Sequence, residues 1–235
     1  MPVKAIIFDL DGTLLDTLED IADAVNRVLL ADGFSTHPLE AYRNFVGDGS
    51  EMLVKRALPE DRRSEDAVKK ALTAFKESYG RSWNRKTRPY DGIPELLDEL
   101  TKHRIRMAVC SNKPHEFTKL SVVEMLGRWR FDRVLGQSRQ YPRKPAPAMA
   151  LAIADHMRIH PGEALFVGDS GVDMQTAAAA GMFPVGAAWG FRTKAELVEN
   201  GCRFLARHPR EVLQVISDRN ASSLDIAHRN SGSHR

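Results

Sequence analysis

Residues 5–17 have the sequence AIIFDLDGTLLDT, an apolar run followed by two carboxylates and a glycine turn. A continuous apolar run such as Ala5 to Phe8 predicts a strand buried on both faces, as strands of parallel sheets are. Asp9 and Asp11 then lie at the carboxyl end of this strand, where open α/β sheets bind ligands. Two carboxylates in one place repel each other, and a divalent cation is a common way to offset their charge. The alternative interpretation is that Asp11-Gly12-Thr13 is only a polar turn, because Asp and Gly are common turn residues.

The composition is that of a globular protein with a sizeable core. The chain has 235 residues, of which 43% are hydrophobic and 28% are charged. The net charge of +3 comes from the stretch beginning at Arg203, which holds six arginines and three acidic residues. Since the rest of the chain is neutral, we expect no nucleic-acid partner. The apolar stretches are too short for a signal peptide or a membrane span, so we expect a cytoplasmic location and no membrane partner.

The cysteines indicate neither a zinc site nor a disulfide framework. Cys110 and Cys202 are the only two, and no Cys/His cluster has the spacing of metal ligands. Cys110 lies in an apolar run, where we expect a small buried hydrophobic residue.

Four apolar runs predict the strands of one sheet. Turn residues follow each run, and in most cases a helical pattern comes next, as at 114–126 and 172–180. Strands that alternate with helices indicate an α/β fold with a doubly wound parallel sheet. The predicted strands are Lys4–Phe8, Arg106–Cys110, Ala164–Val167 and Phe183–Ala188.

A long helical insert separates the first of these strands from the second. It has helical periodicity without a convincing strand pattern, and it is too long for one crossover connection. We therefore expect a core of residues 1–15 and 90–218 and a helical domain of residues 16–89. Residues 219–235 are polar and rich in Ser, Asn and Arg, and we expect them to be a disordered tail.

Polar side chains follow each predicted core strand, and a lysine lies between the second and third strands. If the strands are neighbours, carboxylates, a hydroxyl group and an ammonium group converge on one crevice. Such a set can hold a phosphoryl group and a hard cation. In chain order these residues are Asp9, Asp11, Ser111, Asn112, Lys144, Asp169, Ser170 and Asp173.

These residue types suit phosphoryl transfer. A carboxylate such as Asp9 can attack phosphorus and form an aspartyl phosphate, and Asp11 can give a proton to the leaving alkoxide and later take one from water. Ser111 and Lys144 can bind phosphoryl oxygens and offset their charge. Oxygens of Asp9, Asp11 and Asp169 are the candidate Mg²⁺ ligands, with a main-chain carbonyl as the contribution near Asp11.

Several members of this set also have an ordinary structural interpretation. Ser111, Asn112, Asp169 and Ser170 are typical helix caps. Asp173 would suit the dipole of a first helical turn, or it could orient Lys144, which is otherwise a surface charge.

Four segments in this order resemble the haloacid dehalogenase superfamily of phosphohydrolases: FDLDGTLLDT, VCSNKP, RKPAP and FVGDSGVDMQTAAAAG. The resemblance spans residues 3–216. It implies a Rossmann-like core with an inserted helical cap and a Mg²⁺ cofactor. It also implies that Asp9 is the nucleophile, Asp11 the acid/base, Ser111 and Lys144 phosphate ligands, and Asp169 a metal ligand, with Ser170 and Asp173 in support.

Within the superfamily the chain resembles phosphoglycolate phosphatase-like enzymes. The similar segments are Asn112-Lys113-Pro114, Phe45–Gly49 and Gly186–Gly190. This implies a small phosphorylated metabolite, most simply 2-phosphoglycolate, as the partner of a monomer or homodimer. Gly47 and Gly49 of the cap, with Thr13, Ser111, Asn112 and Lys144 of the core, are the expected substrate contacts. The glycine loop is equally compatible with a flexible turn between two cap helices.

Other functions stay open at this point. The main alternative is a β-phosphoglucomutase-like enzyme or another sugar-phosphate phosphatase, although Ser50-Glu51 stands where the mutases usually carry a basic residue. A haloacid dehalogenase would not need Asp11, and a phosphonoacetaldehyde hydrolase would need a Schiff-base lysine in its cap. A signalling module phosphorylated on aspartate, or a non-catalytic scaffold, would not require the full set of site residues.

Overall fold

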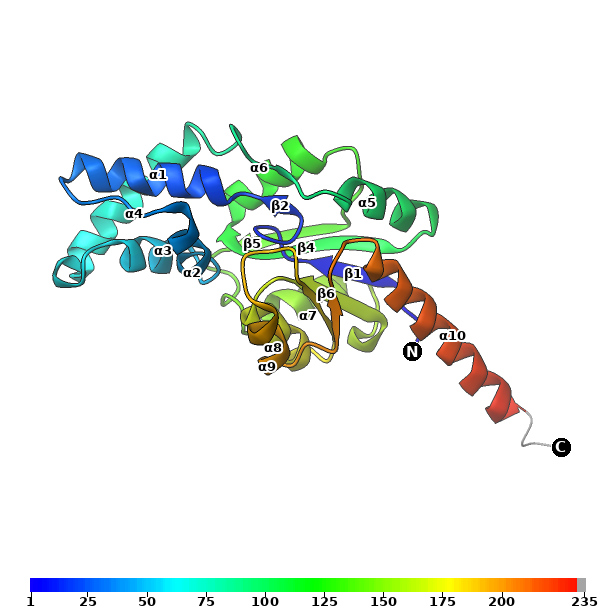
Figure 1. Ribbon diagram of the computed structural model, residues 1–235. Coiled ribbons are helices and arrows are strands. Elements are labelled where there is room, and N and C mark those ends of the chain that lie inside the picture. The colour runs from blue at the N-terminus through cyan, green and yellow to red at the C-terminus, as the bar shows by residue number, and fades with distance from the viewer. Residues whose placement is uncertain (232–235) are drawn as a thin grey trace.

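The computed structural model describes the backbone of residues 1–231 and the side chains of residues 1–221. Its core is a six-stranded sheet in which every neighbouring pair of strands is parallel. The α/β fold with a doubly wound parallel sheet is thereby confirmed (Figure 1). Across the sheet the strands are β5 (Arg133–Gln137), β4 (Arg106–Pro114), β1 (Ala5–Phe8), β6 (Ala164–Gly168), β7 (Phe183–Ala187) and β8 (Phe204–Ala206).

The central strand β1 is buried on both faces, as its apolar run predicts. Ile6 and Phe8 belong to the hydrophobic core on one face of the sheet, and Ala5 and Ile7 to the core on the other. This alternation follows from the two-residue period of a strand. Because β4 and β6 pair with β1 on either side, their carboxyl ends lie next to Asp9 and Asp11.

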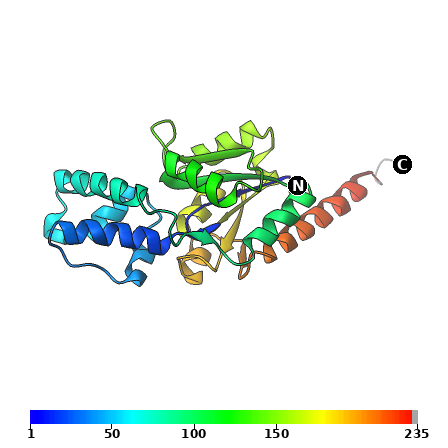
Figure 2. The same cartoon turned by 90° about the horizontal axis from the view of Figure 1, so that it is seen from above.

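Helices cover both faces of the sheet (Figure 2). One core contains residues of α5 (Ile93–Lys102), α6 (His115–Leu126) and α10 (Glu211–Ser231). The other contains residues of α7 (Ala148–His156) and α8 (Gly171–Ala179). The smaller elements on the core are the 3₁₀ helix η2 (Pro161–Glu163) and helix α9 (Lys194–Glu199).

Four further helices form a lobe beside the sheet (Figure 1). They share a hydrophobic cluster that is separate from the two clusters of the sheet; it includes Val25 of the first helix and Phe75 of the last, and also Phe191 from the loop after β7. The chain enters and leaves the lobe through β2 (Leu15–Asp16) and β3 (Arg88–Pro89), which pair antiparallel. This packing supports our proposal that residues 16–89 form a separate cap. The lobe consists of α1 (Leu18–Ala31), α2 (Leu39–Phe45), α3 (Ser50–Ala57), the 3₁₀ helix η1 (Glu60–Arg62) and α4 (Glu65–Gly80).

Of the eight strands in the described residues, β2, β3, β5 and β8 were not predicted from the sequence, and the predicted end of β4 was too early. The apolar pattern of β5 is interrupted by Arg133 and Gln137 at its two ends, and β8 has only three residues, too few to be recognised as a strand. β4 continues through Ser111 and Asn112 to Pro114, and α6 begins only at His115. Ser111 and Asn112 are therefore strand residues, and the helix-cap alternative for them is wrong.

From residue 219 onward the described backbone is helical where we expected disorder. Helix α10 continues to Ser231, and residues 232–235 lie outside the described residues. Its first turns are anchored in the core by Val212 and Val215. No proline or glycine occurs between Glu211 and Ser231 to end the helix. None of the helices in the described part of the chain combines the length and apolarity needed to cross a membrane.

Candidate active site

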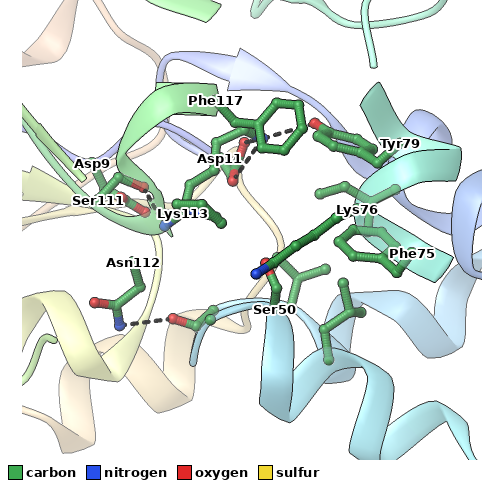
Figure 3. A pocket seen from close by; sticks show the side chains of 16 residues that line it. Asp9, Asp11, Ser50, Phe75, Lys76, Tyr79, Ser111, Asn112, Lys113 and Phe117 are labelled. Atoms are coloured by element: carbon green, nitrogen blue, oxygen red, sulfur yellow. Dashed lines mark hydrogen bonds and ion pairs between the residues drawn. The ribbon is translucent and has the colours of Figure 1, made fainter. Parts of the chain in front are cut away.

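A small cavity of about 50 Å³ lies between the lobe and the carboxyl ends of the core strands (Figure 3). The core contributes Asp9, Asp11 and Ser111 to its lining, and the lobe contributes Gly47 and Phe75 among others. Ligand sites of α/β sheets are expected at this edge, beyond the carboxyl ends of the strands.

Asp9 is paired with Lys144, although the two residues are far apart in the chain. Both are nearly buried, and Lys144 Nζ lies 2.8 Å from Asp9 Oδ1. Lys144 Nζ also lies 2.6 Å from Asp173 Oδ1, so one ammonium group serves two carboxylates. Burial raises the pKa of Asp9 to about 6, against the opposing effect of Lys144. Burial lowers the pKa of Lys144, but the charges of Asp173 and Asp9 outweigh it and the net direction is upward.

Asp9, Asp169 and Asp173 form a buried acidic cluster. Their carboxylate oxygens lie within 4.8 Å of one another. Burial, together with the charges of Asp173 and Asp9, raises the pKa of Asp169 well above its usual range. Because Lys144 is the only cation in ion-pair contact with the cluster among the described residues, three carboxylates face one positive charge. A divalent cation would bring this set to neutrality, so the donor set fits Mg²⁺.

The backbone around Asp169 leaves no room for side chains. A Cβ on Gly12, whose φ is +86°, would lie 2.3 Å from an Asp169 oxygen, and a Cβ on Gly190 would lie 2.2 Å from Asp169 Cβ. Asp169 also accepts hydrogen bonds from Thr13 Oγ1 at 3.1 Å and from the main-chain N–H of Phe191 at 2.8 Å. Thr13, predicted as a substrate contact, therefore holds a carboxylate of the acidic cluster.

The carboxylate of Asp11 is not part of this cluster. Lys113 Nζ lies 2.9 and 3.2 Å from its two oxygens, and Lys113 also donates a hydrogen bond to Tyr79 Oη at 2.7 Å. The structure thus groups Asp173, rather than the Asp11 carboxylate, with Asp9 and Asp169. Burial lowers the pKa of Lys113, but the charge of Asp11 and the contact with Tyr79 outweigh this effect. The pKa of Lys113 is therefore raised overall. Burial raises the pKa of Tyr79 to about 12, so its hydroxyl keeps the proton at neutral pH.

Ser111 and Asn112 lie where β4 reaches the cavity. Ser111 is buried, and its Oγ accepts a hydrogen bond from the N–H of Lys113 at 3.3 Å. The Asn112 side chain accepts from the N–H of Lys144 at 2.8 Å and donates to the carbonyl of Lys144 at 3.1 Å. It also donates to the carbonyl of Gly47 at 3.1 Å. Asn112 therefore fixes the loop that carries Lys144 and ties it to the lobe.

The glycine loop of the lobe lies against the core. Gly47 and Gly49 have φ values of +119° and +87°, which glycine adopts without strain. Arg143 donates a hydrogen bond to the carbonyl of Asp48 at 2.8 Å, and Arg192 donates to that of Val46 at 2.8 Å. The loop therefore forms one wall of the cavity, with its position set by contacts from the core.

Ser170, predicted as a supporting residue, contacts the acidic cluster: its Oγ donates a hydrogen bond to Asp173 Oδ2 at 2.6 Å.

The residues that line the cavity include Lys76, Tyr79 and Lys113, for which the sequence indicated no role. Figure 3 shows Lys76 extending from α4 across the cavity toward Ser50. Among the described residues Lys76 has no ion-pair partner. Lys113 belongs to the segment VCSNKP, so this motif was the feature of the sequence that could have indicated a role for Lys113 in the site. Its partners Asp11 and Tyr79 lie 102 and 34 positions away, so the chain order alone does not pair them.

Comparisons with known proteins agree with this geometry. The family model for haloacid dehalogenase-like hydrolases matches residues 6–187. The phosphoglycolate phosphatase of Nitrosospira multiformis is 36% identical over 207 residues, covering 86% of this chain and 90% of the relative. That of Mesorhizobium japonicum is 34% identical over 232 residues, covering 95% of each chain.

Solved structures share the fold over nearly the whole chain. A crystal structure from Lactobacillus delbrueckii subsp. bulgaricus matches with a TM-score of 0.85 and 30% identity, over 92% of this chain and 99% of that one. A structure described as a predicted phosphoglycolate phosphatase from Haemophilus somnus matches with a TM-score of 0.84 and 26% identity, over 91% and 97%. The chain belongs to the haloacid dehalogenase-like hydrolase family, among phosphatases similar to phosphoglycolate phosphatase.

Proposed function

We propose that the chain is a Mg²⁺-dependent phosphatase that hydrolyses 2-phosphoglycolate to glycolate and phosphate through an aspartyl phosphate on Asp9. One observation carries the proposal. Two carboxylates, Asp9 and Asp11, line the same small cavity, and each has its own lysine, Lys144 and Lys113. This separation of partners suits two different tasks for two residues of the same type.

In the first step a carboxylate oxygen of Asp9 attacks phosphorus, and the bond from phosphorus to the ester oxygen breaks. Asp11 gives its proton to the leaving alkoxide. In the second step Asp11 takes a proton from the water that attacks phosphorus, which releases phosphate and restores Asp9. Lys144 and Ser111 would offset the charge of the phosphoryl oxygens. A Mg²⁺ ion held by Asp9 and Asp169 would supply further charge stabilisation.

The cavity favours a small substrate with a second negative charge. Its volume of about 50 Å³ leaves little room beyond the phosphoryl site. Lys76 is available to pair with an anionic group, and Leu53 and Phe117 give the remaining wall an apolar character. The leaving group of 2-phosphoglycolate is short and carries a carboxylate. A sugar leaving group is larger and uncharged, so this cavity favours phosphoglycolate over the sugar-phosphate alternative.

Phosphate release from a set of esters tests the proposal. The set contains 2-phosphoglycolate, 3-phosphoglycerate, β-glucose 1-phosphate and p-nitrophenyl phosphate, each assayed with Mg²⁺ and with EDTA. We expect the highest kcat/KM for 2-phosphoglycolate and loss of turnover in EDTA that Mg²⁺ restores. A preference for the sugar phosphate would support the alternative activity. Undiminished turnover in EDTA would contradict the metal dependence.

A further inference from the structure

A buried lysine connects a side chain of the lobe to Asp11 of the core. Tyr79 belongs to α4, whereas Lys113 lies at the end of β4 and Asp11 in the loop after β1. Lys113 Nζ lies 2.7 Å from Tyr79 Oη and 2.9 and 3.2 Å from the two oxygens of Asp11 (Figure 3). Its three N–H donors can therefore all be engaged by these two side chains.

The ring of Tyr79 is held in place by its neighbours. Phe75 stacks on it with ring centroids 5.4 Å apart, and Phe117 of the core meets it edge-on at 5.2 Å. Lys113 Nζ lies 4.8 Å from the Tyr79 ring centroid, so the ring and the hydroxyl contact the same ammonium group. Tyr79 is 2% exposed and Lys113 is 7% exposed, so water has little access to the contact between them.

This arrangement depends on where the lobe lies. The ion pair of Lys113 with Asp11 is made by core residues alone, whereas the hydroxyl that fixes Lys113 comes from the lobe. A lysine side chain has several rotatable bonds, so an ion pair to one carboxylate leaves it considerable freedom. Contact with a fixed hydroxyl on the opposite side removes that freedom.

We propose that Tyr79 is a positioning residue that acts on Asp11 through Lys113. With the lobe against the core, the Tyr79 hydroxyl fixes Lys113, and Lys113 holds the Asp11 carboxyl group where the leaving oxygen departs. Closure of the lobe and proton transfer by Asp11 are thereby linked. The inference rests on the proposed function, in which Asp11 protonates the leaving alkoxide.

Tyr79→Phe tests the inference, because it removes the hydroxyl and keeps the ring. The assay compares the single-turnover rate of alcohol release from 2-phosphoglycolate, whose alkoxide needs a proton, with that from p-nitrophenyl phosphate, whose phenolate leaves without one. This measurement isolates the first step, since Asp11 also acts as the base in the second step for both esters. We expect glycolate release to slow roughly 10- to 100-fold, within the usual contribution of general acid catalysis, and nitrophenolate release to change less than about 2-fold.

Tyr42→Phe is the matched control. Tyr42 is a fully buried tyrosine of the lobe whose hydroxyl donates a hydrogen bond to Asn26 Oδ1 at 2.6 Å, and it does not line the cavity. Loss of the Tyr42 hydroxyl should lower the thermal stability and change the rates for both substrates by the same factor. Thermal unfolding of both variants shows whether each is folded at the assay temperature.

A second comparison uses the Asp11→Asn background. If Tyr79 acts through Asp11, adding Tyr79→Phe to Asp11→Asn should lower the single-turnover rate of glycolate release by less than about 2-fold further. An equal loss for both substrates, no loss at all, or an undiminished effect in the double variant would each overturn the inference. A wild-type chain that releases no phosphate with Mg²⁺ would instead overturn the proposed function.

Discussion

Lys144→Met is the variant whose effect follows most directly from the structure. Lys144 is 3% exposed and contacts Asp9 at 2.8 Å and Asp173 at 2.6 Å. Methionine keeps much of the length and apolar surface of the side chain but leaves the acidic cluster without its ammonium group. We expect a large loss of stability in the absence of metal and a smaller loss in its presence.

The magnitude follows from the charges. At an effective dielectric constant of about 20, each of these contacts has a gross attraction of about 6 kcal/mol. Lys144→Met also removes the desolvation penalty of the buried ammonium group, which offsets several kcal/mol of this lost attraction. The net loss expected for breaking a buried pair is about 3–5 kcal/mol. For a chain of this size that corresponds to a fall in Tm of roughly 6–20 °C.

The assay is thermal unfolding in EDTA and in saturating Mg²⁺. Because the cluster of the variant is more negative, the rise in Tm caused by Mg²⁺ should be larger for Lys144→Met than for the wild type. Lys4→Met is the control: Lys4 pairs with Glu163 at 2.7 Å on the surface, and such pairs contribute about 0–1 kcal/mol. If the Tm of Lys144→Met in EDTA falls no further than that of Lys4→Met, the conclusion that the Lys144 ammonium group stabilises the three carboxylates is refuted. Equal responses of wild type and variant to Mg²⁺ would refute the link between Lys144 and the metal.

Three further predictions concern single residues. Lys76→Met should raise KM for 2-phosphoglycolate by about 5- to 50-fold, since it removes a charged contact to the substrate, and leave KM for p-nitrophenyl phosphate nearly unchanged; steady-state kinetics with both esters checks this, and equal changes would argue against the contact. Asp11→Asn should slow the release of alcohol from alkyl phosphates by about 100-fold or more, and the release from aryl phosphates much less. Single-turnover release of the alcohol measures this step, and an equal loss for both classes of ester would contradict the acid role. Cys110 is buried, and burial raises the pKa of its thiol to about 12, so iodoacetamide should leave it unmodified in the folded chain, and mass spectrometry showing rapid native labelling there would contradict the packing.

The parts of the structure that local sequence patterns could predict are those with strong periodicity. The apolar run at Ala5–Phe8 correctly predicted a strand buried on both faces, because every one of its side chains is buried. The acidic and polar residues after the strands converge because the sheet is parallel and β1 lies between β4 and β6. The expected convergence of Asp9, Lys144 and Asp169 depended on the strands being neighbours, and in the structure these side chains do lie together.

The features that were missed depend on contacts between the lobe and the core. Nothing near Lys113 in the sequence indicates that it is buried or that Tyr79 lies against it. The interpretation of Asn112 as a substrate contact likewise lacked its actual partners, which are the main chains of Gly47 and Lys144. β5 was missed for a different reason, since its edge position leaves Arg133 exposed and interrupts the apolar pattern. The surroundings of Lys113 and Asn112 are set by packing between distant segments, which the periodicity of the sequence does not indicate.

The central claim is that Asp9 carries the phosphoryl group, and chemical trapping tests it most directly. The chain is mixed with 2-phosphoglycolate and Mg²⁺, quenched in acid during turnover, and treated with borohydride, which reduces an acyl phosphate to the alcohol. Mass spectrometry of the tryptic peptide of residues 5–27, with Asp9→Asn as the blank, then locates the reduced side chain. We expect homoserine at position 9 and an unchanged Asp11. Reduction at Asp11, or no reduced carboxylate anywhere during steady turnover, would contradict it.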